Sequence, residues 1–485
     1  MADSIAATVD RIKRDPSSVL DRTRIGALCE ELGHVWRERE LDPATTLALF
    51  LQQVLHGNCP CSEVRHLPGG AGDGRSFTGS AYCDARKRLP LAVCQAMLTE
   101  AVDAALPATW RDRHRWLGHR VFHIDGSTFS MPDTPELREA FGMPSGQAKG
   151  CGFPVAHLLV LFSAQTGLLL DAWAGPLRTG DVAQVPEAAA HLLPGDVLVG
   201  DDSFSSYVHL ALLSRDKLHG LFPAHHKRIV SFRPRRRHTA EGKGAVAGMP
   251  RSRWVKYLGK DDQLVEYFKP RQGPRWMSKA EYDALPDSIT VRELRRRVRG
   301  PAGNRVTLTI VTTLSDPDLY PADDLVALRL RRWDVETNLR HLKVTMGMDV
   351  LHCRTEAGVR KELAMFCIAY NLVRVVMLQA AARQEVPVAR ISFADALKWM
   401  RHARPGGTMP DLVVNPHRPG RAEPRCKKRR AKQFDLMNKP RDVLRKRLKK
   451  QKQSVLKILR RRLIRIRESL RISCTMRLRR KILIK

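Results

Sequence analysis

The sequence lacks any uninterrupted run of about 20 apolar residues, the length that a membrane-spanning helix needs. Residues 1–14 also lack the apolar stretch of a secretory signal peptide. These two absences predict a soluble, cytoplasmic protein with no membrane partner. With 485 residues and 43% hydrophobic content, the chain is long enough and apolar enough for two or three domains.

Paired cysteine motifs are also missing. The ten cysteines include no C-x-x-C spacing, and the one close pair, Cys59 and Cys61, has a single residue between its members. No second pair follows at the distance that zinc fingers use. We therefore expect reduced thiols, several of them in the core, rather than a structural zinc site.

Acidic residues are scarce, and the cationic excess is concentrated at one end of the chain. There are 84 Lys and Arg against 50 Asp and Glu, which gives a net charge of +34. Residues 418–485 contain 28 Lys and Arg against four acids, so this segment alone carries +24. Such asymmetry is typical of a polyanion-binding arm and predicts nucleic acid as the partner. The alternative is a solvated tail without a specific ligand.

Residues 1–117 are expected to be helical. Apolar residues recur every three or four positions in 18–37 and in 43–55, and after a glycine-rich break a further helix begins near Ser80. This helix is expected to place four charged side chains on exposed turns, namely Asp84, Arg86, Lys87 and Arg88. Short helices ending in a basic one are compatible with a helix-turn-helix-like DNA-binding domain, although many helical bundles share the pattern.

From residue 118 onward the periodicity is that of an α/β protein. Apolar strands precede two aspartates, Asp125 and Asp201, and a helical stretch lies between the third and fourth strands. The expected strands are 121–124, 154–164, 167–175, 196–201 and 219–225.

The composition changes again after residue 225. Segments of alternating apolar and polar residues, separated by Gly and Pro, predict a mainly β insertion over residues 226–318. Residues 319–402 return to a helical pattern, and residues 403–485 form the basic C-terminal tail.

The sequence around Glu336 predicts an amphipathic helix. Arg332, Arg340 and Lys343 fall on the same side of this helix as Glu336, because each residue advances about 100°. Taken alone, such a face is explained by i,i+4 ion pairs exposed to solvent. The stripe expected to be buried consists of Val335, Leu339, Leu342 and Met346.

Three carboxylates are candidates for one site. Acids at strand ends in an open α/β sheet point into the crevice where ligands bind, so Asp125 and Asp201 are expected to converge there with Glu336. Carboxylate oxygens suit Mg²⁺, and two such ions would activate a nucleophile and stabilise a leaving oxygen of a phosphodiester. Two alternatives stay open: Asp202 could contribute, and Asp125 could simply cap a turn.

Three sequence blocks carry a family resemblance. DGSTFSMPD, DVLVGDDSF and RRWDVETNLRHLK resemble the catalytic blocks of DDE transposases of the insertion-sequence-four family. That family has a Tyr, Arg, Glu, Lys signature, and Arg332, Glu336 and Lys343 match its last three members in spacing. Arg329 stands where the family has tyrosine. The resemblance implies a ribonuclease-H-like core in two parts, 118–225 and 319–402, interrupted by the insertion.

The resemblance also implies roles for the site residues. Asp125, Asp201 and Glu336 would hold two Mg²⁺ or Mn²⁺ ions, and basic residues of the signature helix (Arg332, Arg340, Lys343) would bind DNA phosphates. Trp333 would stack on a base flipped out of the element end, although ordinary core packing explains a helical tryptophan equally well. Trp276 is a second, weaker stacking candidate. The histidines are expected to be structural, with His123 in the core and His225 and His226 in a turn or near a phosphate.

The function predicted on this basis is cut-and-paste transposition. The expected partners are double-stranded DNA carrying the terminal inverted repeats of the element, target DNA, and a second copy of the chain in the DNA-bound complex. Two alternatives remain: a catalytically inactive, basic DNA-binding protein on the same scaffold, and a ribonuclease-H-like nuclease that does not transfer strands.

Overall fold

The computed structural model describes the chain in segments: residues 21–37, 39–67, 76–105, 115–145, 150–226, 228–235, 252–299, 305–402, 409–416, 439–451 and 453. These segments fall into two compact units. The main unit comprises residues 1–142 and 154–424, and the small unit comprises residues 143–153 and 425–485.

The small unit contains a basic helix over residues 441–451. The guanidinium of Arg441, at the start of this helix, lies 4.4 Å from the centre of the Phe153 ring. Residues 454–485, the end of the predicted basic tail, lie outside the described residues.

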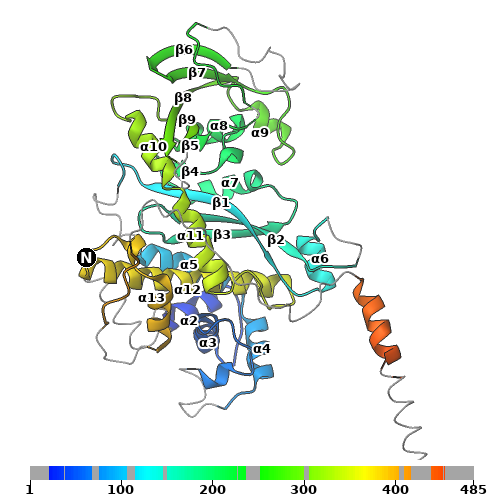
Figure 1. Cartoon of the computed structure of the whole chain (residues 1–485). Helices are drawn as coiled ribbons and strands as arrows, with labels where there is room; N and C mark the ends of the chain where they lie inside the picture. Colours follow the sequence, from blue (N-terminus) through cyan, green and yellow to red (C-terminus); the bar gives the residue numbers. More distant parts are fainter. Residues whose placement is uncertain are drawn as a thin grey trace, which may run out of the picture. The chain divides into compact units, whose positions relative to one another are not determined.

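The main unit is built on one mixed sheet of nine strands in the order β3-β2-β1-β4-β5-β9-β8-β7-β6 (Figure 1). The first three strands pair in antiparallel fashion, whereas β4 is parallel to both β1 and β5. The strands are β1 (Val121–Ser130), β2 (Val155–Ser163), β3 (Leu169–Pro176), β4 (Val197–Val199), β5 (His219–Pro223), β6 (Ser252–Gly259), β7 (Asp262–Phe268), β8 (Ser288–Arg299) and β9 (Arg305–Thr312).

The segment predicted as a mainly β insertion contributes four of these strands, β6 to β9, and the short helix α9 (Lys279–Asp283). Its sheet is continuous with that of the preceding strands, because β9 pairs with β5. A buried ion pair holds its interior together: Arg292 binds Asp262 at 2.6 Å, and the two side chains are 1% and 5% exposed. Nearby, buried Glu293 accepts hydrogen bonds from Tyr267 and Gln263.

Helix α12 (Glu356–Arg383) lies at the centre of the helical layer. It packs against α3, α5, α13 and β3, and most of its residues are buried. By length and composition α12 could cross a membrane, but 89% of its most apolar window is buried inside the fold. The long buried helix predicted at this position is therefore present as a core helix, which begins at its capping residue Thr355.

The N-terminal helices begin at capping residues that the sequence provides. The Asp42 side chain accepts a hydrogen bond from the Thr45 amide, Pro43 occupies the first turn, and the Thr78 side chain caps α4. The remaining helices of the main unit are α2 (Arg22–Glu31), α3 (Pro43–Leu55), α4 (Gly79–Arg88), α5 (Leu91–Ala105), α6 (Pro135–Phe141), α7 (Val185–Ala189), α8 (Tyr207–Arg215), α10 (Ala322–Leu330), α11 (Trp333–Arg340) and α13 (Phe393–His402).

One expectation for α4 is wrong. Arg86 was expected on an exposed turn, but its guanidinium donates to Gln53 Oε1 and to Cys353 Sγ, each at 2.9 Å, and lies 3.6 Å from the centre of the Phe50 ring. Arg86 therefore joins α4 to α3 and to the segment before α12. The other three charged residues of this helix, Asp84, Lys87 and Arg88, are exposed as expected. The eight described cysteines are all free thiols.

Candidate active site

Asp125 and Asp201 lie at matching levels of two neighbouring parallel strands. His123 of β1 pairs with Val199 of β4, and each aspartate lies two residues beyond its member of this pair. The expectation that Asp125 ends its strand is wrong, because β1 continues to Ser130 through its pairing with β2. Asp125 nevertheless lies beyond His123, the last residue of β1 that pairs with β4. The two carboxylates therefore lie at the same end of these two strands.

Glu336 is brought to the same edge by α11, and Arg332 joins it to Asp125. The Arg332 guanidinium donates to Asp125 Oδ2 at 3.2 Å and to Glu336 Oε1 at 2.8 Å. The side chain of Glu336 is 44% exposed, whereas those of Arg332 and Asp125 are 13% and 15% exposed. One cation thus lies between two of the three predicted carboxylates.

The electrostatics of Asp125 show how crowded this anionic site is. The pKa of Asp125 is raised to about 6, mainly by burial and also by the neighbouring charges of Asp201 and Glu336, while Arg332 acts in the opposite direction. Charges that interact in this way are close in space. A site with several partly desolvated carboxylates gains stability from any cation that neutralises them.

The rest of α11 and the π-helical turn after it (His341–Thr345) place their residues much as predicted. Val335, Leu339, Leu342 and Met346 are all buried. Trp333 is 51% exposed, so it is not a core-packing residue. Arg340 is exposed, and Lys343 Nζ donates to Ser127 Oγ on β1 at 2.8 Å. Burial lowers the pKa of the Lys343 ammonium. Because its partner Ser127 is neutral, this ammonium is available to an anionic ligand.

Arg329 also belongs to this site, although it was not among the predicted site residues. Its Nε atom is buried without a hydrogen-bond partner in the described part of the chain. Burial and the neighbouring Arg332 lower the pKa of Arg329 to about 10, while Asp201 and Asp125 act in the opposite direction. Its position in the sequence could have indicated this, because Arg329 stands at the tyrosine position of the family signature, one helical turn before Arg332.

Other candidates have structural explanations. His123 is fully buried, and burial lowers its pKa to about 3, so it is a neutral core residue as expected. Trp276 stacks on His209 with ring centres 5.8 Å apart and packs against the core, so it does not offer a free stacking surface.

The three predicted carboxylates suit hard divalent cations, since they offer only oxygen ligands. Their ligand atoms do not form a closed set in this conformation: one group of three ligands in the described residues lies within 4.8 Å, and it consists of Asp202, His225 and His226. Between Asp125 and Glu336 the guanidinium of Arg332 occupies the place of a cation. The donor set therefore fits metal ions in chemistry and charge, and the Arg332 guanidinium is their stand-in.

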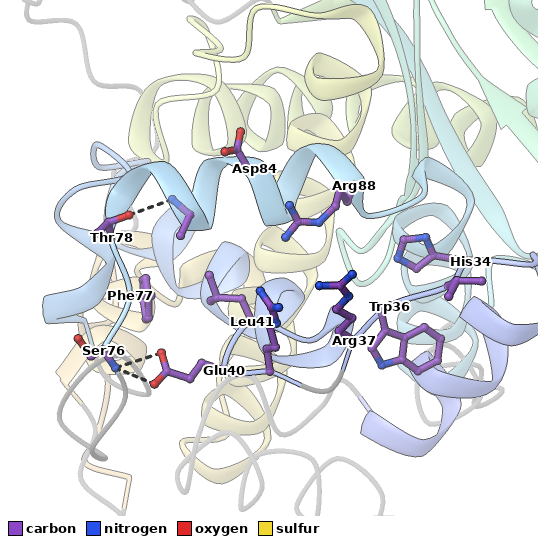
Figure 2. A pocket seen from close by; sticks show the side chains of 13 residues that line it. His34, Trp36, Arg37, Glu40, Leu41, Ser76, Phe77, Thr78, Asp84 and Arg88 are labelled. Carbon is purple, nitrogen blue, oxygen red and sulfur yellow. Dashed lines mark hydrogen bonds between the residues drawn. The ribbon is translucent and has the colours of Figure 1, made fainter.

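A second candidate surface lies in the N-terminal helices, where the segment after α2 faces α4. Figure 2 shows a cavity there, with a volume of about 940 Å³. The rings of His34 and Trp36 stack with centres 6.1 Å apart. Three arginines that line the cavity, Arg37, Arg39 and Arg88, form no ion pair with any residue that the structure describes.

The two acids that line this cavity are already engaged. Glu40 accepts hydrogen bonds from the Ser76 amide, and Asp84 forms an ion pair with Lys87 at 3.0 Å. The cavity is consequently cationic and aromatic, which is the chemistry that binds nucleic-acid strands.

Comparisons with known proteins define the class of this protein. Residues 116–372, more than half of the chain, match the family model of the transposase DDE domain, so the chain belongs to the DDE transposases. It is a DNA transposase of the insertion-sequence-four type, a polynucleotidyl transferase and endonuclease that uses divalent metal ions and acts on DNA.

Three known proteins are similar to this chain. The chain is 26% identical over 408 residues to the transposase InsG for insertion sequence element IS4 of Escherichia coli K12, covering 79% of this chain and 83% of InsG. It is 30% identical over 175 residues to the putative transposase InsZ of the same bacterium, covering 34% of this chain and 58% of InsZ. A piggyBac transposase synaptic complex with hairpin DNA is similar with a TM-score of 0.37 and 11% identity, covering 77% of this chain and 74% of that one.

Proposed function

We propose that this transposase excises an insertion sequence by cutting phosphodiesters at the element ends and then joins the freed 3′ ends to target DNA. Asp125, Asp201 and Glu336 would hold two Mg²⁺ or Mn²⁺ ions. Bound there, such ions would activate the attacking water or 3′-hydroxyl and stabilise the leaving oxygen. The observation that carries this proposal is the arrangement of the two aspartates, each two residues beyond a pair of matched strand residues, with Glu336 joined to Asp125 through Arg332.

The cations around the carboxylates would position the DNA. The guanidinium of Arg332 is a two-pronged donor, suited to a phosphate that approaches the carboxylates. Lys343 can exchange its neutral partner Ser127 for a phosphate oxygen, and exposed Arg340 extends the same cationic face. Trp333, half exposed beside Arg332, would stack on an extruded base, an interaction worth about 1–3 kcal/mol.

We further infer the role of each segment of the chain. The strand order β3-β2-β1-β4-β5, with three antiparallel strands followed by two parallel ones, supports a ribonuclease-H-like core made of residues 118–225 and 319–402. Residues 226–318 would be its insertion. The cationic, aromatic cavity of Figure 2 supports DNA binding by residues 1–117, and the charge of residues 403–485 supports a DNA-binding tail.

The proposed working assembly is a homodimer on paired element ends, with the terminal inverted repeats and the target as its DNA partners. The proposed location is the cytoplasm, where a bacterial element and its host chromosome meet.

Substitution of the carboxylates tests the proposed chemistry. Asp125→Asn, Asp201→Asn and Glu336→Gln should each abolish cleavage of a labelled duplex carrying the element end in Mg²⁺, while DNA binding persists because the cationic surface is unchanged. Asp324→Asn is the matched control, since it removes an exposed carboxylate on α10. Denaturing electrophoresis separates the outcomes: hairpin and joined products indicate transposition, cleavage alone a nuclease, and no product from the wild type an inert binder. Normal cleavage by any of the three variants refutes that residue's assignment.

A further inference from the structure

A second group of metal ligands lies at the ends of β4 and β5, outside the set of carboxylates assigned to catalysis. Asp202 begins the 3₁₀ turn after β4 (Asp202–Phe204), and His225 and His226 follow β5. The chain thus brings together residues that are more than 20 positions apart in sequence. Their ligand atoms all lie within 4.8 Å of one another.

One pair in this group already has the spacing of two ligands on a single ion. His226 Nδ1 is 3.1 Å from Asp202 Oδ2. Two atoms bound to one ion through bonds of about 2.0–2.1 Å are roughly 2.8–3.4 Å apart in octahedral or tetrahedral geometry. An ion could therefore replace the hydrogen bond with little movement of either side chain.

The surrounding contacts restrict these side chains before any ion binds. The His226 amide approaches the same Asp202 oxygen at 3.4 Å, and the rings of His225 and His226 stack with centres 4.3 Å apart. The His226 side chain is 68% exposed, so an ion can enter directly from solvent. Arg329 interacts electrostatically with Asp202. Its positive charge repels a bound cation and so lowers the affinity of the site for metal, but it does not block the ligand atoms.

The ligand types select the class of metal. Two imidazole nitrogens and one carboxylate suit Zn²⁺, Co²⁺ or Ni²⁺, whereas Mg²⁺ prefers oxygen ligands alone. Three protein ligands leave a fourth position for water. We propose that Asp202, His225 and His226 form a binding site for one divalent transition-metal ion of the Zn²⁺ class, separate from the catalytic carboxylates. Such an ion would tie the segment after β4, which contains Asp201, to the segment after β5.

The proposal is tested by titrating the full-length protein, stripped of metal with a chelator, with Co²⁺ and following its visible absorption. The wild type should bind one Co²⁺ with an absorption band that Zn²⁺ abolishes by competition. Replacing one ligand, His225→Asn or His226→Asn, should weaken binding roughly tenfold or more, since even outer-shell partners of a metal are worth about that much. The double variant should lose the band. His66→Asn, an exposed histidine elsewhere, is the matched control and should leave it unchanged.

The catalytic site is separated from this one by an Asp125→Asn/Glu336→Gln variant, which should keep the Co²⁺ band while it loses Mg²⁺-dependent cleavage. Three results would overturn the proposal: no saturable binding by the wild type, equal binding by the histidine double variant, or loss of the band in the carboxylate variant. Circular dichroism establishes that each variant is folded. Cleavage in Mg²⁺ is scored separately, so failure of this site and failure of the proposed function are distinguishable.

Discussion

Arg332→Gln should increase the affinity of the DNA-free protein for Mn²⁺, even though the same change is expected to impair cleavage. In the structure the single guanidinium of Arg332 bonds to both Asp125 and Glu336. A metal ion that binds these carboxylates has to compete with the guanidinium. Glutamine keeps much of the side-chain length and removes the competing charge.

The size of the effect follows from the exposure of the three side chains. The bond to Asp125 joins two groups that are 13% and 15% exposed, and a charged hydrogen bond of this kind contributes about 1.5–3 kcal/mol. The bond to Glu336, whose side chain is 44% exposed, is screened by solvent and contributes at most about 1 kcal/mol. Part of this energy is recovered when the guanidinium is hydrated, so we expect an affinity gain of roughly tenfold, or about 1.4 kcal/mol.

The assay is a Mn²⁺ titration without DNA, in which the electron paramagnetic resonance signal reports the free ion. Arg340→Gln is the control, because it removes the same charge from an exposed position of α11 that has no bond to the carboxylates in the described structure. Any gain in Mn²⁺ affinity that comes only from the lost positive charge appears in both variants. The additional gain in Arg332→Gln measures the competition between Mn²⁺ and the Arg332 guanidinium. Equal affinities for the two variants, or a weaker Arg332→Gln, would refute the reasoning.

Three further results are expected. Truncation after Pro416 should weaken binding to every DNA sequence and should reduce the slope of log K against log salt by about 0.9 for each lost phosphate contact; an unchanged slope in filter binding means that the tail is idle. Burial lowers the pKa of His341 to about 4, below its unfolded value of about 6.5, so its contribution to stability is complete above pH 6.5 and is lost as the pH falls toward 4. His341→Phe preserves the stack on Phe393. Between pH 7 and pH 5 the free energy of unfolding of this variant should therefore fall by about 2 kcal/mol less than that of the wild type in denaturant titrations. The same pH dependence in both proteins would contradict this. Asp262→Asn leaves the Arg292 charge buried and should lower the free energy of unfolding by about 3–5 kcal/mol in the same assay, whereas a loss below 1 kcal/mol would show that the pair is solvated.

Local patterns in the sequence were sufficient for the elements that carry the site. The apolar run before Asp201 predicted β4, and the amphipathic period around Glu336 predicted α11 and its buried stripe. Both depend on residues near one another in the chain, where strand and helix periods are readable. The family resemblance then supplied the reason to group these acids with Asp125.

Contacts between distant segments were not predictable in this way. Arg86 lies in a basic stretch typical of an exposed helix turn, and only its contacts with Cys353 and Phe50, which are distant in sequence, make it a partly buried link between helices. Likewise the strand containing Asp125 was extended by pairing with β2, which no local signal records. The pairing of Asp202 with His226 depends on the parallel neighbours β4 and β5 delivering their ends to one edge.

The pairing between β5 and β9 has a consequence for how this protein can be altered. Pro223, Phe222 and Leu221 of β5 face Ile310, Val311 and Thr312 of β9, so excising residues 226–318 would strip the partner from one side of β5 and leave its peptide groups as an open edge. A shortened chain would have an unpaired edge strand beside β4, the strand that precedes Asp201, and would be prone to self-association. Residues 226–318 are therefore an integral part of the sheet, and they can be removed only if another strand or helix covers β5.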